Sequence, residues 1–172
     1  MIRNYFSIVI TAIILLGCQK EDSKISQTQK IDEIEFSYIN YKRIPFSEVK
    51  IVISRLHRKD TAVLFIQSRP ASNDPKWAYS KIEKFMTIDL KDFQKFADSA
   101  SSLDKINIDK AYQDGHDGST WQIQFGSKGK NKSYSFWSPN YNKRERGLTT
   151  FVNLSEQIIE ASKLKKEEIL KD

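Results

Sequence analysis

The densest group of chemically capable side chains lies at residues 114–119, which read D-G-H-D-G-S. Asp114, His116 and Asp117 are residue types that bind a divalent cation. Alternatively, His116 with an aspartate is the kind of pair that acts as a general base on Ser119. The same letters are typical of a tight turn, in which Gly adopts positive φ and Asp bonds to nearby backbone N–H groups. A turn is the favoured interpretation, and a metal site and a catalytic site are the alternatives.

The rest of the sequence contains no recognisable catalytic motif. The only other histidine, His57, lies in the basic stretch R-L-H-R-K-D, which is typical of a solvent-exposed turn. No nucleophile elbow of the form G-x-S-x-G is present. A catalytic pair of carboxylates has no sequence signature, so this possibility stays open. The sequence therefore predicts no cofactor and favours a non-catalytic protein over an enzyme.

A second group of candidate residues follows the last predicted strand, in the stretch W-S-P-N-Y-N-K-R-E-R. Trp, Tyr and Arg are the residue types that dominate binding hot spots, and a sugar ring can also stack on such aromatic groups. The candidate binding residues are Trp137, Tyr141, Lys143, Arg144 and Arg146. The competing interpretation is structural, because tryptophans fill the cores of sheets, and we expect at least one of Trp121 and Trp137 to do so.

The amino-terminal region has the pattern of a secretory signal peptide. One positive charge at Arg3 precedes the uncharged stretch from Tyr5 to Leu16, which is too short to span a bilayer as a helix, since a span needs about 20 residues. The stretch ends at Leu15-Leu16-Gly17-Cys18, which contains the only cysteine of the chain. This motif resembles the lipobox of bacterial lipoproteins. The resemblance implies cleavage before Cys18 and attachment of a diacylglyceryl group, with palmitate-type acyl chains, to its thiol.

The residues after the cysteine resemble a sorting signal followed by a tether. Gln19-Lys20-Glu21-Asp22 is similar to the lysine-plus-acidic tag that directs lipoproteins to the surface of some bacteria with two membranes. Residues 20–30 contain one aliphatic residue and no aromatic residue, as a flexible linker should. We therefore expect a signal peptide at 1–17, a lipidated tether at 18–30 and one globular domain at 31–172. The expected location is the outer membrane or cell surface, with a periplasm-facing anchor as the alternative.

The charge balance is basic, with 28 Lys and Arg against 22 Asp and Glu. Several cations fall around the second predicted hairpin, and these are Lys128, Lys130, Lys132, Lys143, Arg144 and Arg146. Phosphate groups of nucleic acids are neutralised by such residues. An anchor outside the cytoplasm, however, favours a protein or an anionic glycan as partner over a nucleic acid.

Alternating polar and apolar residues predict most of the sheet. Alternation of polar and apolar residues with a period of two predicts a strand at 31–41. Two further apolar-rich segments, at 47–56 and 62–68, predict a hairpin. A loop at 69–76 precedes another predicted strand at 79–88. Two more runs, 119–125 and 132–137, predict a second hairpin joined by a loop at 126–131.

Helical spacing of apolar residues appears twice. The first predicted helix covers 89–103, with Asp89 as its N-cap, and the second runs from about Thr149 to Leu170. Strands and helices in this order predict an α+β domain, with an antiparallel sheet of five to six strands and two helices packed on one face.

Together these features predict a membrane-anchored lipoprotein that carries a small non-catalytic binding domain, such as an inhibitor or an immunity-type module. The alternative function is an envelope hydrolase or a carbohydrate-binding component of a surface complex. A purely structural part of the envelope is a third hypothesis. The binding-module hypothesis rests on location, size and charge, because residues 31–172 contain no motif that resembles a known family.

Overall fold

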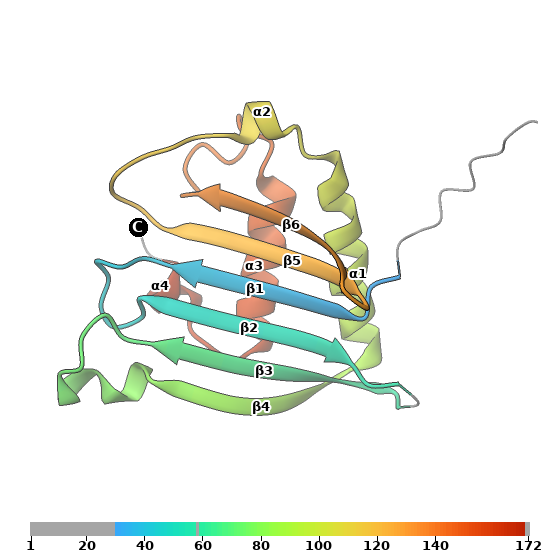
Figure 1. The fold of residues 1–172 in the computed structure, drawn as a ribbon, viewed down its shortest axis with the longest axis horizontal. Helices are drawn as coiled ribbons and strands as arrows, with labels where there is room; N and C mark the ends of the chain where they lie inside the picture. The colour runs from blue at the N-terminus through green and yellow to red at the C-terminus, as the bar shows by residue number, and fades with distance from the viewer. Residues whose placement is uncertain (1–29, 58, 171–172) are drawn as a thin grey trace, which may run out of the picture.

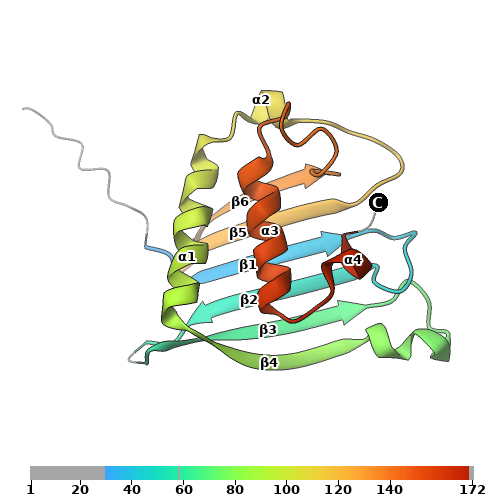
Figure 2. The ribbon, with the colours of Figure 1, turned by 180° about the vertical axis from the view of Figure 1, so that it is seen from behind.

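The computed structural model describes residues 30–57 and 59–170. The predicted signal peptide at 1–17, the predicted lipidation site Cys18 and the tether up to residue 29 lie outside the described residues. The described chain forms one antiparallel six-stranded sheet in the order β4-β3-β2-β1-β5-β6, with helices on one face (Figures 1 and 2). The predicted α+β class is confirmed.

The strands are β1 (Glu33–Ile39), β2 (Glu48–Arg55), β3 (Thr61–Arg69), β4 (Ile82–Asp89), β5 (Thr120–Ser127) and β6 (Lys130–Trp137). Short 3-10 helices are η1 (Pro75–Ser80) and η2 (Ser102–Lys105). The α-helices are α1 (Leu90–Ser101), α2 (Ile108–Ala111), α3 (Thr149–Ala161) and α4 (Lys166–Ile169).

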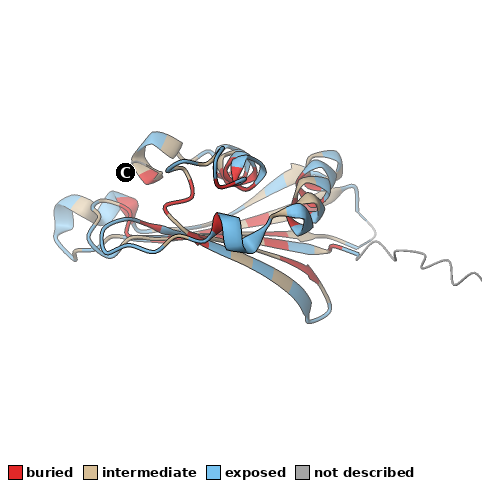
Figure 3. Ribbon diagram, turned by 90° about the horizontal axis from the view of Figure 1, so that it is seen from above, coloured by how far each residue is buried: buried red, intermediate tan, exposed pale blue. Residues whose placement is uncertain are grey.

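The core lies between the sheet and the helix pair α1 and α3. Successive strand residues point to opposite faces, so every second residue of β1, such as Ile34, Phe36 and Tyr38, is buried beneath the helices. Trp121 on β5 is buried as well, and its indole contacts the ring of Phe36 edge to face at 6.4 Å between centroids. The expectation that one of the two tryptophans belongs to the core is thereby confirmed. Figure 3 shows the helices on one side of the sheet and no layer on the other.

The bounds of several elements differ from the prediction, most of all in three places. The second hairpin has a two-residue turn, Lys128-Gly129, and both residues have positive φ (50° and 78°), as the right-handed twist of a hairpin requires. β4 begins at Ile82, because Pro75–Ser80 forms η1. The long carboxyl-terminal helix stops at Ala161, where Lys163 takes the left-handed conformation (φ 60°) that ends many helices.

The first helix begins where the sequence predicts, but without the predicted side-chain cap. Asp89 occupies the N-cap position of α1 and makes no side-chain capping hydrogen bond. The connection that follows α1 contains η2 and α2, neither of which the apolar spacing predicted. No helix within the described residues is long and apolar enough to cross a bilayer.

Candidate functional site

Three loops gather at one end of the sheet, on the left in Figure 1. They are the β1–β2 loop (40–47), the α2–β5 loop (112–119) and the β6–α3 loop (138–148). Their proximity follows from strand pairing, since Ile39 at the end of β1 pairs with Thr120 at the start of β5, and Thr120 pairs with Trp137 at the end of β6. We call the solvent-exposed side chains of these three loops the loop surface.

Arg146, in the β6–α3 loop, ties this loop to the end of α2 and to the end of β6 from inside the protein. Its side chain is only 6% exposed, and its guanidinium donates to backbone carbonyl oxygens of Ala111 (Nε, 3.0 Å), Ser138 (2.8 Å), Tyr141 (3.2 Å) and Trp137 (3.0 Å). Burial lowers the pKa of the Arg146 guanidinium from its ordinary value by desolvating the charge. The predicted role of Arg146 as a binding residue is therefore corrected: it holds loop backbones together and does not face solvent.

The 114–119 segment is a turn that packs against Trp137. The Asp114 carboxylate accepts a hydrogen bond from the N–H of the next residue, Gly115, at 2.8 Å, and the backbone bends at residues 116–118. Gly115 lies so close to the indole that a Cβ there would be 2.2 Å from a ring carbon of Trp137, so only glycine fits. The preferred prediction of a turn agrees with this geometry.

The alternative metal site at Asp114, His116 and Asp117 is not formed. No three His, Cys, Asp or Glu side chains lie together in a way that could hold a metal ion in the described parts of the chain. Asp117 instead pairs with Lys42 of the β1–β2 loop, and this hydrogen bond and charge lower the pKa of the Asp117 carboxyl. The carboxylate therefore connects two loops.

The suggested catalytic arrangement of His116 and Ser119 is also not assembled in this segment. Ser119 is buried, and its Oγ accepts a hydrogen bond from the indole N–H of Trp121 at 2.8 Å. His116 is exposed to solvent. His57, at the β2–β3 turn, is exposed at the opposite end of the sheet.

The loop surface is rich in exposed aromatic side chains. Tyr41 is 86% exposed, Tyr112 72% and Tyr141 57%, and the apolar side chain of Ile44 is also exposed. Of the remaining predicted binding residues, Arg144 is exposed, Lys143 is half-buried, and Trp137 is half-buried under the 114–119 turn. Sequence reasoning missed Tyr41, Ile44 and Tyr112. The two tyrosines could have been identified from the sequence, because each is an aromatic residue among polar neighbours.

The basic residues of the second hairpin do not form one cluster. Lys128, Lys130 and Lys132 lie at the turn of the hairpin, whereas Lys143 and Arg144 follow the far end of β6. The eight residues of β6 separate the two groups by roughly 25 Å at 3.3 Å per residue. Lys132 moreover pairs with Asp104. A single basic patch is therefore not present.

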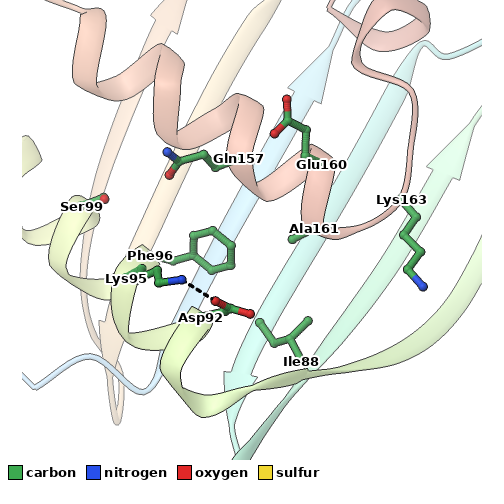
Figure 4. A pocket seen from close by; sticks show the side chains of 9 residues that line it. All are labelled: Ile88, Asp92, Lys95, Phe96, Ser99, Gln157, Glu160, Ala161 and Lys163. Atoms are coloured by element: carbon green, nitrogen blue, oxygen red, sulfur yellow. Dashed lines mark hydrogen bonds and ion pairs between the residues drawn. The ribbon is translucent and has the colours of Figure 1, made fainter.

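A hollow of about 580 Å³ opens between α1 and α3 above β4 (Figure 4). Ile88, Phe96 and Ala161 line it with apolar surface. Its acidic side chains are paired, Asp92 with Lys95 at 2.8 Å and Glu160 with Lys166 at 2.9 Å. The residues that line it include no histidine, and both of its carboxylates are engaged in ion pairs.

Comparison with protein-family models, with curated proteins and with solved structures finds no significant match. The fold and the loops define the class of the protein as an α+β domain with loops gathered at one end of its sheet. Its function is therefore argued from the geometry of these loops.

Proposed function

We propose that this chain is a lipoprotein anchored through Cys18 and that its domain is a non-catalytic binding module that recognises a protein through the loop surface. The anchor is supported by the signal-peptide pattern, the L-L-G-C motif and the linker-like composition of the residues that follow. Two or more acyl chains are needed for durable attachment, because one chain anchors only marginally.

The observation that carries the binding hypothesis is the exposure of Tyr41, Tyr112 and Tyr141 on loops that are fixed to one another. Tyrosine provides a large and rigid contact area at a small cost in conformational entropy, which is why it is abundant in binding loops. An exposed aromatic group that is already held in place loses little freedom when a partner binds.

The loops are fixed by contacts that cross between them. Arg146 ties the end of α2 to the β6–α3 loop, and Lys42 forms an exposed and therefore weak ion pair with Asp117. The Ser138 N–H donates to the carbonyl of Ser119 at 2.7 Å. These contacts support a preorganised surface.

The chain enters the domain at the end of β1 remote from the loop surface (Figures 1 and 2). Asp32 fixes this point: its carboxylate accepts a hydrogen bond from Ser127 at 2.6 Å and pairs with Lys30 at 3.1 Å. Partial burial alone raises the pKa of the Asp32 carboxyl, but these two hydrogen bonds outweigh it, and the pKa lies below its ordinary value. A tether attached here leaves the loops uncovered.

The charges of the loop surface favour a protein partner over an anionic glycan. The exposed cations Lys42 and Arg144 are accompanied by the exposed acids Asp114 and Glu145, and Lys42 is itself paired with Asp117. A polyanion is repelled by the two acids, whereas a protein surface can match both signs. An inhibitor or immunity-type module, which binds a harmful enzyme, requires a surface of this kind.

We expect the combined substitutions Tyr41→Ala, Tyr112→Ala and Tyr141→Ala to abolish partner capture without changing the thermal midpoint. Each hot-spot aromatic contributes more than about 1 kcal/mol, so removing three of them weakens binding by roughly a hundredfold or more. The measurement is quantitative mass spectrometry of proteins retained from culture supernatant and envelope extract by the immobilised mature chain.

The matched control replaces Trp77 and Tyr79 of η1 by alanine, which removes aromatic side chains from the β3–β4 connection outside the three loops. This control should retain the same partner as the unmodified chain. Equal retention by the triple variant would refute the proposed surface. Retention of nothing by any chain, together with hydrolytic turnover that is lost in His116→Ala, would refute the binding function itself.

A further inference from the structure

β4 forms an open edge of the sheet. It pairs with β3 on one side, and no described element lies beyond it (Figures 1 and 2). The N–H of Leu90 donates to the carbonyl of Asp60 at 3.0 Å, so even-numbered residues of β4 bond to β3. The N–H and C=O groups of Glu83, Phe85 and Thr87 therefore point away from β3, toward the free edge of the sheet. Another strand can form hydrogen bonds with them there.

The side chains of this edge are unusually apolar for a strand exposed to solvent. Phe85 is 71% exposed, and its ring lies 4.7 Å from that of Phe65 on β3, measured between ring centroids. On the opposite face of the strand, Ile82, Met86 and Ile88 are only half-buried. Of the devices that normally protect an edge strand, proline and bulges are absent from β4, and its three charges, Glu83, Lys84 and Asp89, are of both signs, so they do not repel every partner.

We propose that the occupant of this edge is the β4 strand of a second copy of the chain, paired antiparallel about a two-fold axis at Phe85. This inference is independent of the proposed function, since it uses no residue of the loop surface. The resulting cross-strand pairs are Phe85 with Phe85, Glu83 with Thr87, Lys81 with Asp89, Ile82 with Ile88 and Lys84 with Met86.

This register is selected by charge. It places Lys81 opposite Asp89 at both ends of the interface, and neither residue forms an ion pair with other residues that the structure describes. A shift by two residues one way places Glu83 opposite Asp89, and a shift the other way places Lys84 opposite Lys84. Like charges directly opposite are destabilising, whereas opposite charges and aromatic pairs stabilise a sheet.

The helix that follows β4 leaves room for this pairing. α1 starts directly after β4 and runs across the sheet toward β6, away from the edge (Figure 2). Both copies then present their helices on the same side, because paired residues point to the same face of a sheet. The helix-free faces of the two sheets then form one continuous surface. On this surface Phe65 and Phe85 of both copies lie in one row of aromatic side chains.

The test is disulfide cross-linking of the full-length chain in intact cells. In the proposed register the two Phe85 Cα atoms lie about 5.5 Å apart, which is within the range of a disulfide. Phe85→Cys should therefore form a covalent dimer under mild oxidation. Ser133→Cys on the other edge strand, and the chain with no added cysteine, should remain monomeric.

A second pair of variants tests the register while retaining Phe85. Chains carrying Glu83→Cys and chains carrying Thr87→Cys should cross-link to each other when both are expressed, and neither should cross-link with itself, since like positions are about 13 Å apart. Adding Phe85→Lys to both chains should abolish this product by placing two lysines opposite each other.

Three outcomes would overturn the proposal. The first is the absence of a dimer in both experiments. The second is equal cross-linking of Phe85→Cys and Ser133→Cys, which would indicate random collision. The third is a cross-linked product whose mass differs from twice that of the chain, which would show that a different polypeptide occupies the edge.

Discussion

Replacing Arg146 by alanine is expected to lower the free energy of unfolding by about 3 kcal/mol or more, because four buried or half-buried carbonyl groups lose a charged donor. The guanidinium of Arg146 bonds to the carbonyls of Ala111, Trp137, Ser138 and Tyr141, which belong to two segments far apart in sequence. In a domain of this size the change corresponds to a fall of roughly 10 °C in the thermal midpoint.

The measurement is chemical unfolding of the mature chain, followed by circular dichroism. Arg144→Ala is the matched control, because Arg144 is two residues away but exposed, and its loss should change stability by less than about 0.5 kcal/mol. Arg146→Lys should give an intermediate loss, since an ammonium group cannot reproduce the planar fork of donors. Equal stabilities of Arg146→Ala and Arg144→Ala would contradict the structural role assigned to Arg146.

Replacing Cys18 by serine is expected to abolish lipidation and to release or mislocalise the protein. A serine hydroxyl is not the nucleophile that accepts the diacylglyceryl group, so no acyl chain is attached. Each buried methylene of an acyl chain contributes roughly 0.8 kcal/mol to membrane binding, and the loss of two or three chains leaves no comparable apolar segment in residues 19–172.

Two readouts test this expectation. Incorporation of labelled palmitate should be lost in Cys18→Ser, and the protein should no longer sediment with membranes in its unmodified amount. Ser26→Ala, a change in the predicted tether, should behave as the unmodified chain. Normal labelling of Cys18→Ser would show that another residue carries the lipid or that the labelled product is not this protein.

The fold could be predicted from the sequence where one periodicity holds over a whole element. Alternation from Ile34 to Tyr38 predicts β1 because one face of the strand is buried and the other is not. The apolar stripe of α1, with Phe93 and Ala97 buried, predicts a helix for the same reason. Ends of elements are harder, because they depend on backbone conformation at single residues.

Two such ends show what the pattern could not predict. Lys163 ends α3 in a left-handed conformation that glycine usually adopts, so the sequence carries no stop signal and the apolar stripe continues past it. Tyr41 continues the alternation of the first strand, yet β1 ends at Ile39 and Tyr41 is exposed in the loop. Because the predicted strand included Tyr41, the sequence did not identify this residue as part of the loop surface.

The candidate site was predicted only in part for a related reason. Arg146 lies in the charged run N-K-R-E-R, and nothing local distinguishes it from Arg144. Its burial depends on carbonyl groups that tertiary contacts bring together, such as that of Ala111. Asp117 likewise pairs with Lys42, 75 residues away, which no local spacing predicts.

The central claim is that Cys18 is the lipid-bearing first residue of a tethered binding module. The most direct measurement is mass spectrometry of the amino-terminal peptide of the native protein, extracted from membranes. We predict a peptide that begins at Cys18 and carries a thioether-linked diacylglyceryl group. A native chain that begins at Met1, or one in which the thiol of Cys18 is free, would contradict the claim.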